Sequence, residues 1–179
     1  MIYEKHDLDM QYYYNLEQQL KKTRTTIIDP DEELLNKEVP IRVLKLFSSN
    51  FRKSNLLFLM FETNIYIADK LYLDKHYESA ASWYMKVLKE VECLKFYNKT
   101  PHIYYRLGVC ELKMCFYTDA LVYLKKAKIV SSEQNDNCTY SKTLYHLADS
   151  YLYLKDYDNS DKYTEELMNL YQDDKVSYD

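Results

Sequence analysis

A pattern of small and aromatic residues recurs with a period of 40 residues, and this repetition constrains the fold more than any other feature of the chain. Each copy has a small residue, then an aromatic residue nine positions later, then a second small residue after three more. The three copies are Ala68, Tyr77 and Ala80, then Gly108, Tyr117 and Ala120, then Ala148, Tyr157 and Ser160. A fixed period of this length indicates one supersecondary unit repeated along the chain.

Each copy predicts a pair of helices joined by a short turn. In the central copy, from Pro101 to Ala127, apolar residues follow helical spacing up to about Met114 and again from Tyr117. A single helical hairpin cannot bury its own apolar face, so the copies must stack, and stacked hairpins leave a concave surface that binds partners. We therefore expect an all-α fold, a short α-solenoid of three hairpins preceded by an N-terminal helical cap.

The expected organisation follows the repeat. We expect the cap over residues 1–53, the three hairpins over 54–172 (about 54–97, 101–133 and 138–172) and an acidic tail over 173–179. The hairpin helices should span about 54–74, 77–96, 101–114, 117–132, 138–155 and 157–172, and the cap helices 3–24, 30–38 and 41–51. Ser54 and Thr100 are the expected N-caps of two helices, because Ser and Thr favour that position and Pro101 follows Thr100.

The low glycine and proline content supports the helical interpretation. The chain has one glycine and three prolines, too few for the tight turns of sandwiches, barrels and phosphate-binding loops. Its apolar runs are far shorter than the roughly 20 residues that cross a bilayer, and its first residues lack a signal-peptide pattern. We therefore expect a cytoplasmic protein with no membrane contact, whose four cysteines remain reduced as buried thiols.

Charge argues against nucleic acid as a partner. The net charge is −4, and from Asp156 onward eight acidic residues stand against two lysines. The rest of the chain is close to neutral and has no clustered basic face to neutralise phosphates. No direct nucleic-acid binding is expected.

Catalytic and metal sites are not expected either. Cys110 and Cys115 are five residues apart, whereas zinc sites use tighter cysteine or paired Cys/His spacing. His102 and His146 do not complete such a pattern. No glycine-rich phosphate loop, His-Glu-x-x-His motif or serine-centred elbow occurs. The sequence therefore predicts that the protein is not an enzyme and has no catalytic residues, no metal and no cofactor.

The small and aromatic positions together resemble the tetratricopeptide repeat. The resemblance covers about Asn64 to Tyr171, with a period longer than the common one of about 34 residues. Residues 68–79 (ADKLYLDKHYES) and 103–110 (IYYRLGVC) are similar to bacterial peptide receptors of the Rap, Rgg, NprR and PlcR type. The resemblance implies an intracellular, non-catalytic regulator that binds a signalling peptide in its concave groove. The last copy departs from the pattern at Ser160, Thr164 and Leu167, which predicts a loosened terminal repeat.

Candidate binding residues follow from the helical spacing of the first helix of each hairpin. One stripe of each helix should face the concave side, and aromatic rings with a few charged anchors suit an extended peptide. Asp69, Arg106 and Asp149 should bind its termini, charges or backbone. The partner-binding residues predicted in this way are Glu62, Asp69, Tyr72, Tyr105, Arg106, Val109, Lys142, Tyr145, His146 and Asp149, and the stripe also includes Ile65, His102, Leu112 and Leu152.

Several alternatives fit the same pattern. Tyr105 and Tyr145 could pack only between neighbouring hairpins. The end of the last hairpin, or the apolar residues 51–61, could pair with a second copy, as in a structural or oligomerising adaptor that forms a homodimer. The chain could also be the sensor part of a transcription regulator without its DNA-binding domain. The carboxylate clamp of chaperone-binding tetratricopeptide domains is not expected, because Ile65, Asp69 and Val109 stand where that clamp has Lys and Asn.

Overall fold

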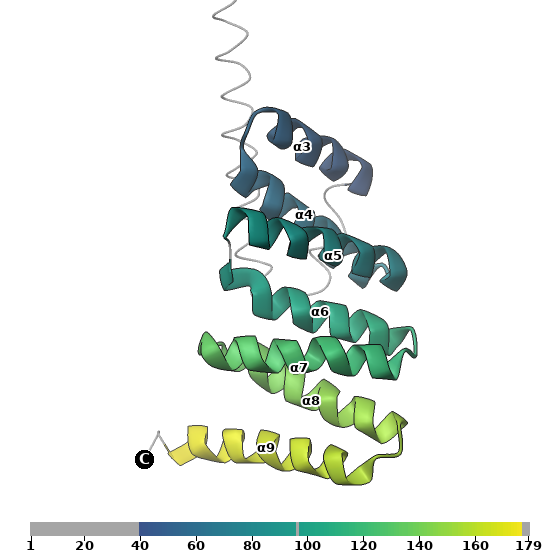
Figure 1. The fold of residues 1–179 in the computed structure, drawn as a ribbon, viewed down its shortest axis with the longest axis vertical. Helices are drawn as coiled ribbons and strands as arrows, with labels where there is room; N and C mark the ends of the chain where they lie inside the picture. Colours follow the sequence, from purple (N-terminus) through teal and green to yellow (C-terminus); the bar gives the residue numbers. More distant parts are fainter. Residues whose placement is uncertain (1–39, 96, 177–179) are drawn as a thin grey trace, which may run out of the picture. The chain divides into compact units, whose positions relative to one another are not determined.

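A computed structural model describes residues 40–95 and 97–176 of the chain (Figure 1). The chain divides into two compact units, Met1–Thr63 and Asn64–Asp179. All the elements assigned within the described ranges are helices, which confirms the all-α expectation. The helices expected at 3–24 and 30–38 lie outside the described residues.

The described part of the first unit contains α3 (Ile41–Lys53) and the beginning of α4 (Leu57–Leu73). Ser54, the expected N-cap of the second of these helices, is instead the C-cap of α3. The prediction is wrong because Asn55 adopts a positive φ of 57° and turns the chain before α4 begins. Serine at such a boundary fits the end of one helix as well as the start of the next.

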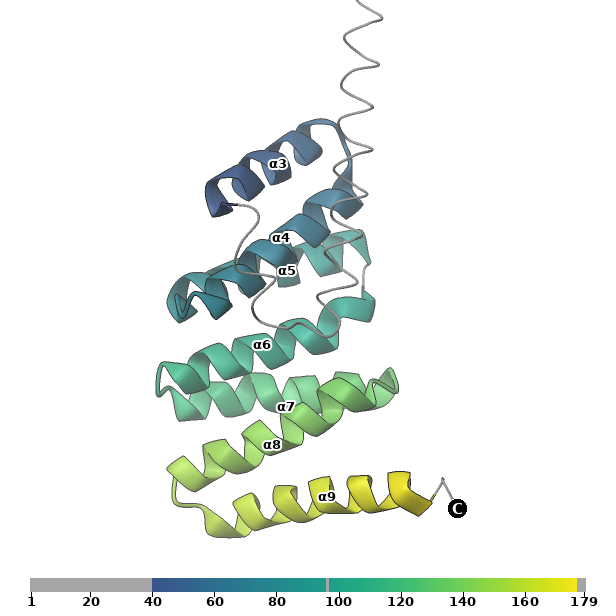
Figure 2. The same ribbon diagram turned by 180° about the vertical axis from the view of Figure 1, so that it is seen from behind.

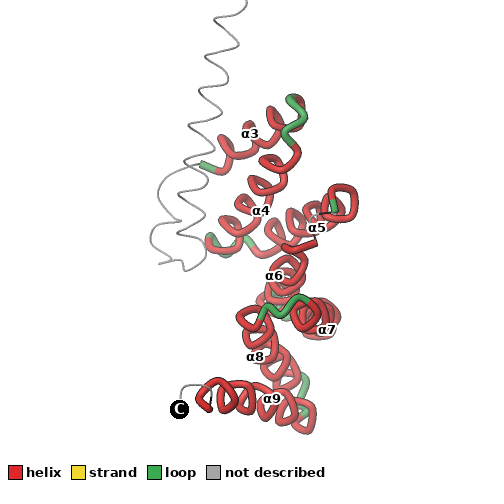
Figure 3. The backbone as a smooth tube through the Cα atoms, turned by 90° about the vertical axis from the view of Figure 1, so that its left-hand side faces the viewer, coloured by secondary structure: helices red, strands yellow, loops and turns green. Residues whose placement is uncertain are grey.

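The second unit contains the rest of α4 followed by a stack of helices. These are α5 (Tyr77–Leu94), the short 3-10 helix η1 (Tyr97–Lys99), α6 (Thr100–Lys113), α7 (Tyr117–Glu133), α8 (Asn137–Tyr153) and α9 (Tyr157–Val176). From α5 onward each α-helix packs against the next (Figures 1 and 2). α6 also contacts α8, and α7 lies against both (Figure 3). The helix ends agree with the expected ranges to within a few residues, and the consecutive packing is solenoid-like, as expected. We call α6 and α7 the middle hairpin and α8 and α9 the last hairpin.

The turns recur every 20 residues without using glycine. Positive φ angles occur at Asn55, Lys75, Lys95, Cys115, Asn135 and Lys155. At Cys115 the amide of Phe116 donates to the Glu111 carbonyl at 2.9 Å, and the Cys115 amide donates to the Leu112 carbonyl at 3.0 Å. These are the two bonds of a Schellman helix end, where glycine is the usual left-handed residue. The 40-residue repeat is therefore two 20-residue units, each a helix and a turn.

Small residues mark where the two helices of a hairpin approach most closely. At Gly108 of α6, an added Cβ would lie 2.6 Å from Cγ of Leu124 in α7. In the last hairpin, Ser160 Oγ donates to the carbonyl of Ala148 at 3.0 Å. This hydroxyl joins the two helices of the last hairpin, and the loosened last repeat that Ser160, Thr164 and Leu167 predicted stays a prediction.

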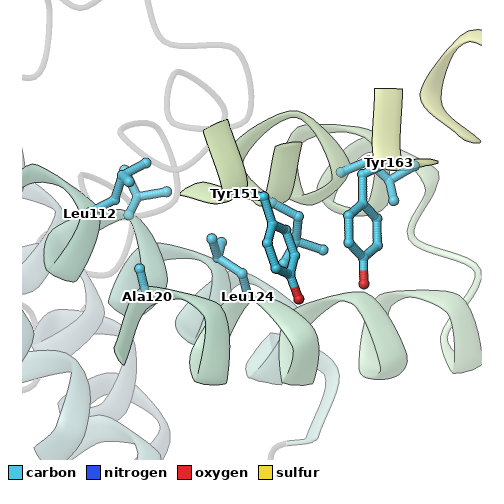
Figure 4. Close-up of a cluster of buried hydrophobic side chains, with 8 residues drawn as sticks. Leu112, Ala120, Leu124, Tyr151 and Tyr163 are labelled. Carbon is cyan, nitrogen blue, oxygen red and sulfur yellow. The ribbon is translucent and has the colours of Figure 1, made fainter. Parts of the chain in front are cut away.

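A buried cluster holds the middle and last hairpins together (Figure 4). Its members are Val109, Leu112, Ala120, Leu124, Leu144, Leu147, Tyr151 and Tyr163. The rings of Tyr151 and Tyr163 stack with centroids 5.7 Å apart. Beside the cluster, Lys128 Nζ of α7 lies 2.7 Å from Glu166 Oε2 of α9. Tyr140 of α8 donates to the same carboxylate, so three helices share one polar junction.

Aspartates cap both helices of the last hairpin. Asp136 Oδ1 accepts from the Thr139 amide at 3.0 Å, and Asp156 Oδ1 accepts from the Asn159 amide at 3.2 Å. Thr100 has no such role, because Lys99 is the N-cap of α6 and Thr100 is its first, buried residue. The predicted cap is displaced by one position, since η1 leads directly into α6.

Candidate binding site

The predicted partner-binding residues lie in several different surroundings. Glu62 belongs to the first unit and is half-buried. In the second unit, a buried polar network contains Asp69, Tyr72 and Arg106, and Val109 lies in the core. A cavity is lined by Tyr105, Lys142, Tyr145 and His146. Asp149 is half-buried and lies outside that cavity. The predicted stripe is therefore divided between structural and accessible positions.

The buried network centres on the carboxylate of Asp69, which is 4% exposed. The hydroxyl of Tyr84 donates to Asp69 Oδ1 at 2.5 Å, and His102 Nε2 lies 3.2 Å from the same oxygen. Arg106 Nε forms an ion pair with that oxygen at 3.5 Å. Burial by itself raises the pKa of this carboxyl group. The charge and hydrogen bond of His102 and the charge of Arg106 outweigh burial and lower the pKa to about 2.

Arg106 is held from two sides. Its guanidinium carbon lies 4.5 Å from the centroid of the Tyr72 ring, a cation–π contact. Burial lowers the pKa of Arg106, but the negative charge of Asp69 outweighs it and keeps the pKa above its ordinary value. Arg106 and Asp69 therefore compensate each other's charge inside the unit. The prediction that they anchor a peptide's termini does not fit this arrangement, because a buried ion pair that loses one partner is costly.

Val109 cannot contact a partner in this fold. It is fully buried in the cluster that includes Leu112 and Leu147. Helical spacing placed it on the stripe expected to face the concave side, but this residue packs with Leu144 and Leu147 of α8 instead. The prediction of Val109 as a binding residue is wrong for this reason.

The accessible part of the predicted stripe is a cavity of about 380 Å³, which we call the α8–α9 cavity. Four predicted residues line it, Tyr105 from α6 and Lys142, Tyr145 and His146 from α8. Tyr145 is 58% exposed. Tyr105 is half-buried, since it packs against the core cluster and also lines the cavity.

Four further residues line the α8–α9 cavity, and the sequence analysis missed them: Cys138, Ser141, Leu167 and Tyr171. Cys138 and Ser141 lie one helical turn before Lys142 and Tyr145, so their spacing on α8 could have revealed them. Leu167 and Tyr171 come from α9, the second helix of its hairpin. The stripe was restricted to first helices, and no sequence signal indicated that α9 closes the cavity.

His146 supplies polar capacity to the cavity. Its ring centroid lies 5.7 Å from that of Tyr105 and 5.0 Å from that of Tyr145. Its Nδ1 atom is buried and has no hydrogen-bond partner among the described residues. Burial, followed by the positive charges of Lys113 and Arg106, lowers the pKa of His146 to about 4. The imidazole is therefore neutral near pH 7, with one nitrogen able to accept a hydrogen bond.

Asp149 lies apart from the cavity, nearer the turn at Tyr117. The pKa of Tyr117 is raised mainly by its hydrogen bond with Cys115 and by burial, and the charge of Asp149 adds a smaller contribution. The Tyr117 ring stacks on that of Tyr153, with centroids 4.9 Å apart. Asp149 is thus not positioned with the other predicted anchors.

The cysteines do not assemble into a site. Burial raises the pKa of Cys110 to about 12, so this thiol stays protonated. Cys93, Cys115 and Cys138 are exposed, and the expectation of buried thiols is wrong for these three because they lie at helix ends or turns. No cluster of three metal-ligating side chains occurs within 40–95 and 97–176.

No protein-family model matches this sequence, and no curated protein matches it. Across the described ranges, no helix combines the length and the apolar character needed to span a membrane.

Proposed function

We propose that this protein is a non-catalytic interaction module of the tetratricopeptide type that binds a peptide or a segment of another protein at the α8–α9 cavity. The observation that carries the proposal is the cavity itself. Helical spacing and the cavity lining select the same four residues: Tyr105, Lys142, Tyr145 and His146. No catalytic role is assigned to any of them.

The lining chemistry supports a peptide ligand. The rings of Tyr105, Tyr145 and Tyr171 offer large contact areas with polar tips, which suit an apolar side chain beside a polar backbone. The imidazole of His146 adds a polar ring to the lining. Lys142 adds a positive charge at the edge. A ligand with an apolar side chain next to an acidic one matches this set.

The proposed role is regulation inside the cytoplasm, in line with the peptide receptors that the sequence resembles. The cavity is built from α6, α8 and α9. A ligand that touches all three favours the packing that contacts it best and shifts the population of the unit toward that packing. Binding at the cavity would therefore change the packing of the last hairpin and, with it, the surface that a second partner contacts.

A display library of random peptides, panned against the full chain, tests the proposal. Binders should lose about tenfold or more in affinity for Tyr145→Ala, because a large ring is removed from the cavity. Tyr157→Ala is the matched control, since Tyr157 is 59% exposed and does not line the cavity. A library without binders, or binders that do not distinguish Tyr145→Ala from the wild type, would contradict the proposal.

Self-association is a second candidate function. Met168 and Tyr171 are largely exposed on α9, at the end of a helix stack, where repeat proteins carry a polar capping surface. Light scattering at micromolar concentration tests this candidate. A dimer that Met168→Glu dissociates supports it, and a monomer removes it.

A further inference from the structure

The middle and last hairpins carry equivalent residues 40 positions apart whose burial differs. Leu112 of α6 is 6% exposed, whereas Leu152 of α8 is 53% exposed. Ser131 of α7 is fully buried, whereas Tyr171 of α9 is largely exposed. The surface that the middle hairpin presents to its successor is therefore covered, and in the last hairpin no described residue covers its counterpart.

The element that covers the middle hairpin is the first helix of the next one. Leu144 and Leu147 of α8 pack with Leu112 and Leu124 in the buried cluster. Figure 1 shows α8 running in the same direction as α6 and opposite to α7. The middle hairpin is thus completed by a helix parallel to its own first helix.

The α8–α9 cavity lies where the first half of such a helix would sit. It is lined by Tyr145 from the first half of α8 and by Leu167 and Tyr171 from the second half of α9. One repeat earlier, the start of α8 meets the second half of α7, because Lys128 Nζ lies 5.9 Å from the centroid of the Tyr140 ring. The cavity therefore corresponds to a place that a helix fills in the middle hairpin.

We infer that the segment bound at the cavity is an amphipathic α-helix of another protein, which stacks on α8 and α9 as α8 stacks on α6 and α7. The inference rests on the proposed function and names the conformation of its ligand. α8 provides the pattern for the buried face of that helix, with small or apolar residues at i, i+4, i+5, i+8 and i+11. The buried residues of α8 with this spacing are Thr139, Thr143, Leu144, Leu147 and Ser150, whereas the buried Tyr151 stacks on Tyr163 of its own hairpin.

The positive charge at the cavity favours a ligand helix that carries an acidic residue. Lys142 is exposed at the cavity and has no hydrogen-bond or ion-pair partner in the part of the chain that the structure describes. Lys113 also places positive charge near His146. An acidic residue in the first two turns of the ligand helix complements these cations, and it also interacts favourably with the positive end of its own helix dipole.

Two synthetic peptides test the inference with the full chain. The first copies residues 137–153 with Cys138→Ser and with Lys142→Glu to supply the acid. The second also carries Tyr145→Pro, which breaks the helix at a position that is exposed in α8. In fluorescence anisotropy measurements, the first peptide should bind the protein at least about tenfold more tightly than the second peptide does. Far-UV circular dichroism should show that it gains helix on binding.

Variants of the protein locate the peptide. Tyr171→Ala should weaken binding of the first peptide about tenfold, because it removes a ring of α9 that lines the cavity. Tyr157→Ala should leave binding unchanged. Equal binding of the two peptides, no binding of either, or no effect of Tyr171→Ala would overturn the inference. A dimer of the chain that the first peptide dissociates would also overturn it, because the helix would then come from a second copy.

Failure of the inference can be told apart from failure of the proposed function. Display-library binders that depend on Tyr145 but tolerate proline at every position would overturn the helical ligand and leave the interaction module in place. A library without Tyr145-dependent binders would remove the proposed function itself.

Discussion

The middle hairpin and the last hairpin follow the same 40-residue pattern, but their equivalent residues have different surroundings. In the middle hairpin, Arg106 is paired with Asp69 and Leu112 lies under α8. In the last hairpin, the equivalent residues are His146, which lines a cavity, and Leu152, which is exposed. The role of a position in this fold therefore depends on its neighbouring hairpins as well as on its own residue type.

Neutralising Asp69 should cause the largest loss of stability. Asp69→Asn leaves Arg106 charged and mostly buried without its counter-ion, which should cost about 3–5 kcal/mol in the free energy of unfolding. His146→Asn, at the position equivalent to Arg106, should cost less than about 1 kcal/mol because no ion pair is lost. Urea unfolding followed by far-UV circular dichroism measures both. Similar losses for the two variants would mean that the ion pair of Arg106 does not make this position more important for stability than its equivalent, His146.

Leu112 and Leu152, the equivalent leucines of α6 and α8, give the most direct test of whether a neighbouring helix covers each hairpin. Leu112→Ala removes a side chain from the buried cluster and should cost about 2–5 kcal/mol. Leu152→Ala changes an exposed side chain and should stay within about 0.5 kcal/mol of the wild type. The same urea unfolding experiment applies. A large loss for Leu152→Ala would show that something already covers α8 in solution.

Acid should remove the contribution of Asp69 to stability. Its folded pKa of about 2 lies below the ordinary 3.8, so the ionised carboxylate stabilises the fold above the unfolded pKa. The contribution, about 2 kcal/mol, should be complete above about pH 5 and should be lost as the pH falls from about 4 through 2. Urea unfolding at a series of pH values measures it. The Asp69→Asn variant should lack this part of the pH dependence, and an unchanged acid profile would rule out the assignment.

A methyl group at the close helix crossing should lower stability in the middle hairpin and raise it in the last hairpin. Gly108→Ala places a Cβ against the buried Leu124 and should cost about 1–2 kcal/mol, after the gain in helix propensity is included. Ala148→Gly removes a methyl at the equivalent position and should cost about 1 kcal/mol through lower helix propensity. Thermal unfolding measures both changes. A stabilised Gly108→Ala protein would show that Leu124 can move aside.

The smallest expected effect is a gain, and it should be the same in both hairpins. Cys115 and Lys155 occupy left-handed turns with φ of 66° and 59°. Replacing either with glycine relieves the strain of a side chain there, at the cost of greater entropy in the unfolded chain, for a net gain of about 0.5–1 kcal/mol. Each of these turns joins the two helices of one hairpin, so packing against a neighbouring hairpin should not change the gain in stability. Unequal gains in thermal unfolding would show that the turns also respond to neighbouring hairpins.

Much of the local structure could be predicted from the sequence. The spacing of Gly108, Tyr117 and Ala120 gave the two helices of the middle hairpin and their close crossing, because helix formation and small-residue contacts depend on residues near one another in the chain. Cap positions were less predictable. Thr100 and Ser54 have the right chemistry for N-caps, but the turn at Asn55 and the 3-10 helix before Thr100 decided where each helix begins.

The binding site was only partly predictable. Tyr145 and His146 were found through helical spacing, and Tyr171 was missed because it reaches the cavity from a different helix. Val109 was assigned to the concave face but is buried beneath α8. Asp69 was expected to be accessible because an unpaired buried charge is costly, but Tyr84, His102 and Arg106 provide the partners that its burial requires.

The sequence by itself determined the helices, their 40-residue repeat and the faces that meet within each hairpin, since these follow from side-chain spacing along a few turns. Only the tertiary structure decided which parts of those faces are covered. Burial depends on what packs from the next hairpin, and helical periodicity gives the direction of a side chain but not what lies in front of it. Leu112 and Leu152 hold the same place in the pattern, yet within the described residues a helix packs over Leu112 and leaves Leu152 exposed.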